Sequence, residues 1–239
     1  LTFDAQVELF RQQPISRDKP TAFVAGYAYE KQLGTHPIDK VVYKAQELGL
    51  LLGEIYTLIT GHCPGVPGYT AKAALEKGAS VIGISPYATS AEHLSGWRNS
   101  KLYSETEFRI EPEKCATLAL HTGAGVWHRD IFNIELTNNH LQQVYIIGGN
   151  EGTSHEIFVS VAHHSIIGAL LGIGGVSDDI ASIKDYLGRH NINNHIVEDT
   201  DPKALIEKVN ALDRKLKSQD TKNALPTPLK TLLDTLEAK

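Results

Sequence analysis

The chain has 239 residues, of which 41% are hydrophobic and 21% are charged, as in globular proteins large enough to bury a full core. Its net charge is -5 and it has no run of basic residues, which argues against a nucleic-acid partner because phosphate backbones are bound by clustered Lys and Arg. The two cysteines are too few for a disulfide framework, no apolar run approaches the roughly 18 residues of a membrane span, and no signal peptide opens the chain, so we expect a cytoplasmic protein without a membrane partner.

Short apolar runs alternate with amphipathic segments along most of the chain, and these two patterns predict buried strands and helices. In chain order they predict a strand at 21–25, a helix at 37–52, a strand at 55–60, a helix at 69–77, strands at 80–85 and 116–120, a helix at 126–136, a strand at 144–147, a helix from Thr153, a strand at 165–171, a helix from about Ser177, a strand at 195–197 and a helix at 201–217. Residues 86–109 are long, polar and aromatic, and we expect a lid or a pair of short edge elements there.

The alternation of strands and helices predicts an α/β fold with a doubly wound, mainly parallel sheet and helices on both faces. Parallel neighbours need right-handed helical crossovers, which cover the two faces of the sheet. We expect one domain over 21–217, an N-terminal extension over 1–20 and a C-terminal helical tail over 218–239.

Ligands of such sheets bind at the carboxyl ends of the strands, where the strand order reverses. The glycine-rich loops of this chain all follow predicted strands, and they begin at Gly26, Gly61, Gly123, Gly148 and Gly172. The topology therefore predicts that these loops line one cleft.

The segment that follows the strand at 144–147 has the composition of an anion site. Gly148, Gly149 and Gly152 would let the backbone approach a ligand closely, and Thr153 opens a helix whose free N–H groups attract negative charge. A purely structural alternative stays open, in which Thr153 and Glu156 form a capping box at the start of this helix.

Several other functional classes lack their motifs. The first strand is followed by Gly26 without G-x-G-x-x-G, and no Gly-Lys-Ser/Thr follows any strand, which argues against a dinucleotide oxidoreductase and a Walker-type NTPase. The adjacent His163 and His164 point in different directions and no metal-ligand spacing is present, so no metal is expected. Cys63 follows the second strand, but no base is identified that would make it a nucleophile.

Residues 149–156 resemble the PGGxGTxxE signature of the LOG (lysine decarboxylase-like) family of Rossmann-like proteins. Residues 59–67 resemble the second-strand loop of that family, especially of its molybdenum-cofactor carrier branch, and 174–177 resemble the loop after the next strand. Arg129 stands where the family places its arginine, and the match covers roughly 23–209. The chain departs from the signature where Gly148 replaces its proline, Asn150 replaces its second glycine, and Glu151 adds a negative charge.

The resemblance implies a Rossmann-like fold, a homodimer or higher homo-oligomer, and a small phosphorylated ligand such as a nucleoside 5'-monophosphate. It leaves two activities open, which are hydrolysis of the bond between base and ribose 5'-phosphate and non-catalytic carriage of the molybdenum cofactor or a related anion. The apolar residues of the helix that starts at Pro37 are expected to face a partner subunit. The ligand-binding residues that it implies are Gly26, Gly61, Gly65, Gly148, Gly149, Gly152, Thr153 and Gly174.

For hydrolysis, the implied catalytic residues are Arg129 and Glu156. Cleavage of a glycosidic bond builds positive charge on the sugar, which the Glu156 carboxylate would stabilise while it activates water. Arg129 would hold the 5'-phosphate or orient the ribose. An alternative for Arg129 is a surface salt bridge within its own helix.

Overall fold

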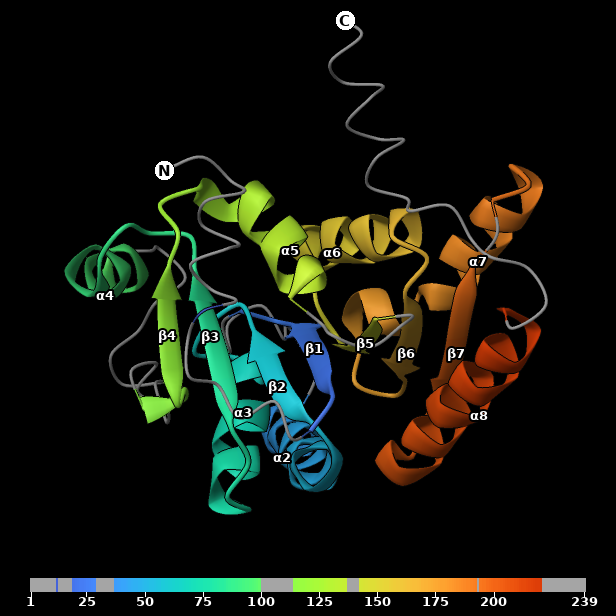
Figure 1. Cartoon of the computed structure of the whole chain (residues 1–239), viewed down its shortest axis with the longest axis horizontal. Coiled ribbons are helices and arrows are strands. Elements are labelled where there is room, and N and C mark those ends of the chain that lie inside the picture. The colour runs from blue at the N-terminus through green and yellow to red at the C-terminus, as the bar shows by residue number, and fades with distance from the viewer. Residues whose placement is uncertain are drawn as a thin grey trace, which may run out of the picture.

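We analysed a computed structural model of the chain, which describes residues 12, 19–28, 37–99, 114–136, 142–192 and 194–220. Seven strands form one sheet in the order β4-β3-β2-β1-β5-β6-β7, and every neighbouring pair is parallel (Figure 1). The strands are β1 (Thr21–Gly26), β2 (Thr57–Thr60), β3 (Val81–Ser85), β4 (Leu118–His121), β5 (Gln143–Ile147), β6 (Ile166–Leu170) and β7 (His195–Asp199). The predicted doubly wound parallel sheet is confirmed, and its order reverses between β1 and β5.

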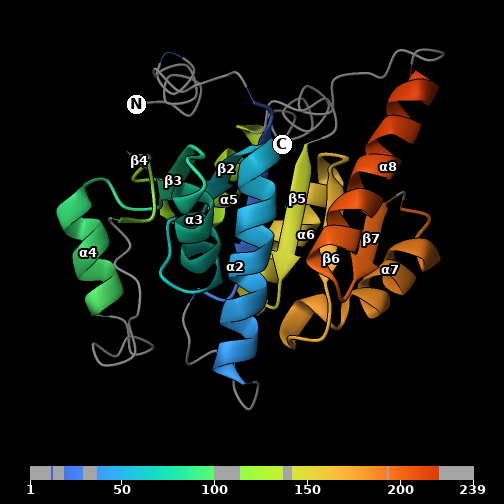
Figure 2. The ribbon, with the colours of Figure 1, turned by 90° about the horizontal axis from the view of Figure 1, so that it is seen from below.

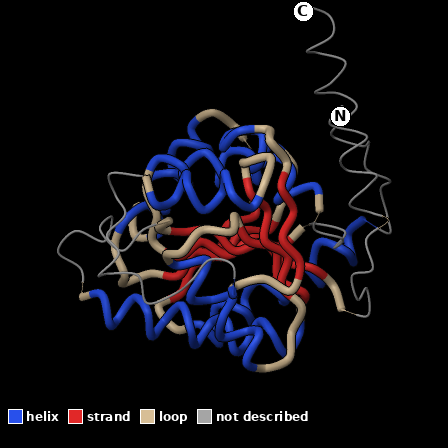
Figure 3. Tube along the Cα trace, turned by 90° about the vertical axis from the view of Figure 1, so that its left-hand side faces the viewer, coloured by secondary structure: helices blue, strands red, loops and turns tan. Residues whose placement is uncertain are grey.

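Helices cover both faces of the sheet, so the molecule has three layers (Figure 3). One face carries α2 (Ile38–Ile55), α3 (Val66–Glu76) and α8 (Pro202–Asp220), which lie in front of the sheet in Figure 2. The other face carries α5 (Gly125–Glu135), α6 (Glu151–Ala162) and α7 (Ile180–Arg189). A further helix, α4 (Ser90–Arg98), lies beyond the β4 edge of the sheet (Figures 1 and 2).

Successive residues of the central strands pack in two separate hydrophobic cores, because side chains alternate between the faces of a sheet. On β5, Tyr145 and Ile147 enter the core beneath α2, α3 and α8, whereas Val144 and Ile146 enter the core beneath α5, α6 and α7. All four are fully buried. This double coverage explains why the central strands are continuous apolar runs in the sequence.

The apolar residues of α2 have a different role from the predicted one. Val41, Val42, Ala45 and Leu48 are buried in the chain's own core rather than presented to a partner. The expectation that this stripe faces a second subunit is therefore wrong, because the sheet already covers it. A homodimer stays a prediction, and Tyr43 of the same helix is 62% exposed.

Several element boundaries differ from the sequence prediction. Helix α3 begins at Val66 because Pro67 fits the first helical turn, and α6 begins at Glu151 with Asn150 as its N-cap. The described part of 86–109 contains one short element, the helix α4, and the remainder lies outside the described residues, so the predicted lid or pair of short edge elements stays a prediction. Most of the predicted extension over 1–20 and of the tail over 218–239 also lies outside them. No helix in the described ranges is long and apolar enough to cross a membrane.

Candidate functional site

A pocket of about 220 Å³ opens where the carboxyl ends of β1, β2, β3 and β5 lead into their loops. Its lining combines two kinds of residue. The polar part comes from the ends of β1 and β2 and from α5 and α6 with the N-cap of α6, and it comprises Gly26, Gly61, Arg129, Asn150, Gly152, Thr153 and Glu156. The apolar part comprises Ala28, Cys63, Pro67, Pro86, Tyr87, Trp97 and Val126.

The loop between β5 and α6 depends on glycine for its shape. Gly149 has a φ of +95°, and a Cβ there would lie 2.3 Å from the Thr153 hydroxyl. Two hydrogen bonds join this loop to the loop after β6. The Val176 amide donates to the Gly149 carbonyl at 3.0 Å, and Ser177 Oγ accepts from the Gly148 amide at 2.9 Å. The backbone is thus held in one conformation before any ligand binds.

The first turn of α6 borders the pocket through Gly152 and Thr153. Its first intrahelical bond runs from the Ser154 amide to the Asn150 carbonyl, so the amides of Glu151, Gly152 and Thr153 precede the hydrogen-bond ladder. The Asn150 side chain does not cap the helix. Since Thr153 lies inside the first turn and is not the N-cap, the capping-box alternative is wrong.

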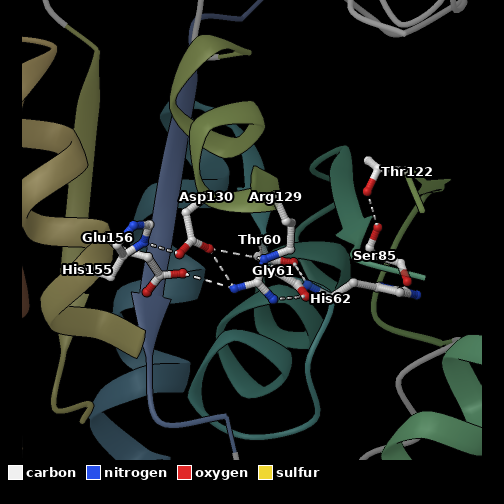
Figure 4. Close-up of polar contacts among 9 residues, drawn as sticks. All are labelled: Thr60, Gly61, His62, Ser85, Thr122, Arg129, Asp130, His155 and Glu156. Atoms are coloured by element: carbon white, nitrogen blue, oxygen red, sulfur yellow. Dashed lines mark hydrogen bonds and ion pairs between the residues drawn. The ribbon is translucent and has the colours of Figure 1, made fainter. Parts of the chain in front are cut away.

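Arg129 projects from α5 between two carboxylates and the backbone of β2's loop, as Figure 4 shows. Its guanidinium donates to Asp130 at 2.8 and 3.2 Å, to the Gly61 carbonyl at 3.2 Å and to Glu156 at 3.4 Å. A Cβ on Gly61 would lie 2.9 Å from the guanidinium, so glycine is needed for this approach. The other oxygen of Asp130 is 2.7 Å from Nδ1 of His155.

This cluster is buried, so the alternative of a surface salt bridge for Arg129 is wrong. The exposed fraction is 8% for Arg129, 0% for Asp130 and 6% for Glu156. Burial opposes the charge of Arg129, but Asp130 and Glu156 together raise its pKa above the ordinary value. The guanidinium is therefore permanently charged. Its contact with Asp130 is shorter and stronger than its contact with Glu156.

Glu156 differs from the charged carboxylate that the sequence predicts. Burial and the negative charge of Asp130 raise the pKa of Glu156 to about 8, although Arg129 opposes this change. One cation cannot fully neutralise two buried carboxylates. At neutral pH, Glu156 is therefore mostly protonated and is suited to donate a proton.

The predicted ligand-binding glycines divide into two groups. Gly26, Gly61 and Gly152 line the pocket together with Thr153, as do both predicted catalytic residues. The others shape the surrounding backbone instead: Gly65, Gly148, Gly149 and Gly174 do not belong to the lining. The loops at Gly123 and Gly172 also stay outside it, so the predicted single cleft is formed by fewer loops than expected.

Asp130, Tyr87 and Trp97 were not among the predicted site residues. Asp130 follows Arg129 in α5, beyond the first turn of the helix, and nothing in the local sequence indicates that it is buried. Tyr87 and Trp97 belong to the polar, aromatic stretch around α4, and only the fold brings them to the pocket. The many aromatic residues of that stretch were the one sequence feature that could have indicated a ligand-binding role.

Cys63 also lines the pocket, but its thiol is unreactive. Burial raises the pKa of Cys63 to about 12, with Arg129 opposing the change and Glu156 adding to it. A thiol rather than a thiolate is therefore present at neutral pH, and only the thiolate is nucleophilic.

We expect Cys63 to resist a thiol reagent in the folded protein and to react fully in denaturant. A Cys115→Ser variant isolates the reaction of Cys63, since these are the two cysteines of the chain. Stopped-flow labelling with an aromatic disulfide at about pH 7.5 measures the rate of the thiolate reaction. Labelling of the folded variant as fast as that of a small free thiol would show that Cys63 is activated.

Comparison with solved structures gives relatives of the same fold. The structural-genomics target TM1055 superposes with a TM-score of 0.62 at 22% identity, over 80% of this chain and 99% of that one. The molybdenum cofactor binding protein of the phototrophic bacterium Rippkaea orientalis gives 0.56 at 22% identity, over 82% and 99%. The molybdenum cofactor carrier protein of Chlamydomonas reinhardtii gives 0.55 at 20% identity, over 81% and 98%.

Sequence comparison adds a family. No curated protein matches the chain significantly by sequence. The model of the SLOG cluster4 family (LDcluster4) matches residues 26–206, which is more than half of the chain and spans every residue of the pocket. The LOG-like resemblance of the glycine-rich segment is thereby confirmed, and the chain belongs to the SLOG cluster4 family.

Proposed function

We propose that this protein binds a small phosphorylated ligand, with the phosphate at the N-terminus of α6. The observation that carries the proposal is the set of three amides, from Glu151 to Thr153, that precede the hydrogen-bond ladder beside the pocket. Helix N-termini favour anions through these amides and through the helix dipole. The Thr153 hydroxyl adds a donor at the same place.

Arg129 has a different part in this proposal from the one that the sequence predicted. Its donors already serve Asp130, Glu156 and the Gly61 carbonyl, so the backbone of α6 supplies the main phosphate contacts. The charge of Arg129 still raises the potential of the pocket, where it forms part of the lining.

Non-catalytic carriage is the activity that we favour for this site. Two of the structural relatives are a binding protein and a carrier protein for the molybdenum cofactor, and we carry over a related phosphorylated cofactor to this chain as the ligand class. The pocket's apolar residues would hold the organic part of such a ligand beside the phosphate site.

Hydrolysis of a nucleoside 5'-monophosphate is the second candidate, favoured by the protonation of Glu156. A buried carboxylic acid with a pKa of about 8 can protonate a departing base at neutral pH. In this mechanism Glu156 protonates the departing base as a general acid, and its carboxylate then accepts the proton of the water that adds to the sugar.

The two activities are distinguished by incubating the protein with ligands and looking for products. Thermal shift measurements with inorganic phosphate, ribose 5-phosphate, nucleoside monophosphates, molybdate and a pterin phosphate identify what binds. Chromatography then tests for free base. Binding without released base supports carriage, release of base supports hydrolysis, and the absence of binding by any phosphorylated compound would refute the proposal.

Gly152→Ala is expected to weaken phosphate binding without destabilising the fold. A Cβ at Gly152 would meet no atom within 4 Å, so alanine fits and gains up to about 1 kcal/mol of helix propensity. Its methyl group would stand beside the amides of the first turn, and we expect ribose 5-phosphate affinity to fall on the order of 10-fold, as for the loss of about 1.4 kcal/mol.

Gly188→Ala is the matched control, because Gly188 is also helical and also has open space around its Cβ position. Calorimetric titration should give the parent affinity for this variant. Equal affinities of the Gly152→Ala and Gly188→Ala variants would place the phosphate elsewhere. Gly149→Ala is less informative, since its Cβ would collide with Thr153 and distort the loop.

A further inference from the structure

The apolar part of the pocket is built around one buried histidine of α4. His93 is 1% exposed, and its ring stacks on His62 with 4.4 Å between centroids and 26° between planes. The rings of Tyr87, Trp97 and His121 meet its edges at 76°, 79° and 73°. Tyr87 and Trp97 also line the pocket, so His93 is the shared support behind two lining residues.

Hydrogen bonds fix the orientation of this support. The indole N–H of Trp97 donates to the His93 ring, 2.9 Å from Nε2 and 3.1 Å from Nδ1, and Nδ1 lies 2.8 Å from the Ser85 hydroxyl oxygen. A neutral imidazole has one donor and one acceptor nitrogen, and in the tautomer with its proton on Nδ1, Nε2 accepts from Trp97 while Nδ1–H donates to Ser85. The same Ser85 oxygen accepts from the Tyr87 amide at 3.1 Å. Hydrogen bonds through Ser85 and His93 thus hold Tyr87 and Trp97 at the end of β3.

The protonation state keeps this arrangement intact. Burial, assisted by His62, His121 and Arg129, lowers the pKa of His93 to about 3. The ring is therefore neutral throughout the physiological range and retains its acceptor for Trp97. The stacked rings of His62 and His93 do not converge on an ion, and the described residues contain no group of three ligating side chains that could hold a metal.

Tyr87 is held by close packing as well. A Cβ on Gly96 would lie 2.1 Å from the Tyr87 ring, so the absence of a side chain in α4 lets this ring lie against the helix. Trp97 packs in turn against Cys63 and Ala28 in a cluster separate from the two main cores. Both aromatic side chains are thus immobilised at the pocket, which lowers the entropic cost of binding a rigid ligand against them.

We propose that Tyr87 and Trp97 form an aromatic wall that selects ligands with a planar ring next to their phosphate, and that His93 is the positioning residue of this wall. The inference rests on the proposed phosphate site, because the wall and the α6 N-terminus line one pocket. It goes further by assigning ring recognition to α4 and its loop. A nucleobase or a pterin has the required shape, and aromatic side chains bind such rings through their faces and edges.

Three phosphorylated probes test the wall by calorimetric titration: adenosine 5'-monophosphate, ribose 5-phosphate and an alkyl phosphate with an apolar area similar to that of adenine. The parent should bind adenosine monophosphate on the order of 10-fold tighter than the other two, as expected for one stacked base. In Trp97→Leu, this preference should fall to within about 3-fold, with ribose 5-phosphate affinity changed by less than about 2-fold. The control Trp127→Leu, at a residue that is 49% exposed and outside the pocket lining, should keep the preference.

His93 is tested by two further variants. His93→Phe keeps the aromatic volume but removes the acceptor for the indole, so ring preference should fall and the tryptophan fluorescence should change. His93→Gln supplies an amide oxygen as acceptor, so it should keep part of the ring preference and part of the parent's tryptophan fluorescence. If His93 only filled space, His93→Phe would keep more of the ring preference than His93→Gln, because Phe replaces the ring volume better than Gln does.

The outcomes separate the two proposals. Binding of ribose 5-phosphate without any preference for adenosine monophosphate would overturn the wall but keep the phosphate site. If the adenine ring and the alkyl chain raise the affinity equally relative to ribose 5-phosphate, the wall does not recognise planarity. If neither phosphate compound binds, the proposed function fails and this inference fails with it.

Discussion

Glu156→Gln is expected to stabilise the protein at high pH and to leave its stability nearly unchanged at low pH. The folded-state pKa of Glu156, about 8, exceeds the ordinary value of 4.5, so the folded protein retains a proton that the unfolded chain releases between these values. Stability due to this group is complete below pH 4.5 and is lost as pH rises through about 8. Glutamine is always neutral, and we expect the variant to exceed the parent by at least about 2 kcal/mol at about pH 8.5.

Urea unfolding between about pH 5 and about pH 8.5 measures this difference. Glu151→Gln provides a matched control on the same helix, since Glu151 is exposed and should show no comparable dependence on pH. If Glu156→Gln instead became more harmful as pH rises, Glu156 would have to be ionised in the folded protein and stabilised by Arg129.

The same variant discriminates between the proposed activities. Glutamine cannot donate the proton that a departing base requires, so a hydrolase should lose on the order of 100-fold or more in turnover while it still binds the monophosphate. A carrier has no turnover to lose. Its affinity should change only slightly, because the introduced glutamine has the size and the neutral charge of protonated Glu156.

The fold was predictable because its strongest signal is local. The strand at 144–147 is covered on both faces, so each of its residues is apolar, and the glycines that follow mark the turn into α6. Helix starts were less predictable. The sequence placed the start of α6 at Thr153 because Thr and Glu three residues apart imitate a capping box, whereas Asn150 begins the helix without a side-chain cap.

The candidate site was predictable only where it coincides with a motif. Arg129 and Glu156 were found through a family resemblance. Their contact could not be predicted from local patterns, because the two residues lie 27 positions apart on different helices. The burial of Asp130 and its effect on the pKa of Glu156 depend on three-dimensional packing, which no local pattern reports. The aromatic wall was missed for the same reason, because Gly96 acquires its meaning only when the Tyr87 ring lies against it.

Arg129→Met is expected to be the most destabilising single change in the pocket. Methionine fills much of the volume of the arginine stem but leaves Asp130, which is 0% exposed, without its cationic partner. Removing one partner of a buried ion pair typically costs about 3–5 kcal/mol, because the remaining charge is no longer compensated. The Gly61 carbonyl also loses its donor. Urea unfolding at neutral pH measures the loss.

A double-mutant cycle identifies the cause of this loss. Asp130→Asn removes the stranded charge, so Arg129→Met combined with Asp130→Asn should be more stable than Arg129→Met alone, by on the order of 1–3 kcal/mol. Arg189→Met is the exposed control: its ion pair with Asp185 leaves the arginine side chain 69% exposed, and its loss should cost less than about 1 kcal/mol. Similar costs at the two arginines, or a double variant no better than the single one, would contradict the view that Arg129 exists mainly to neutralise carboxylates. The phosphate would then be the natural partner of its guanidinium, and the affinity of Arg129→Met for ribose 5-phosphate should fall whether or not its stability does.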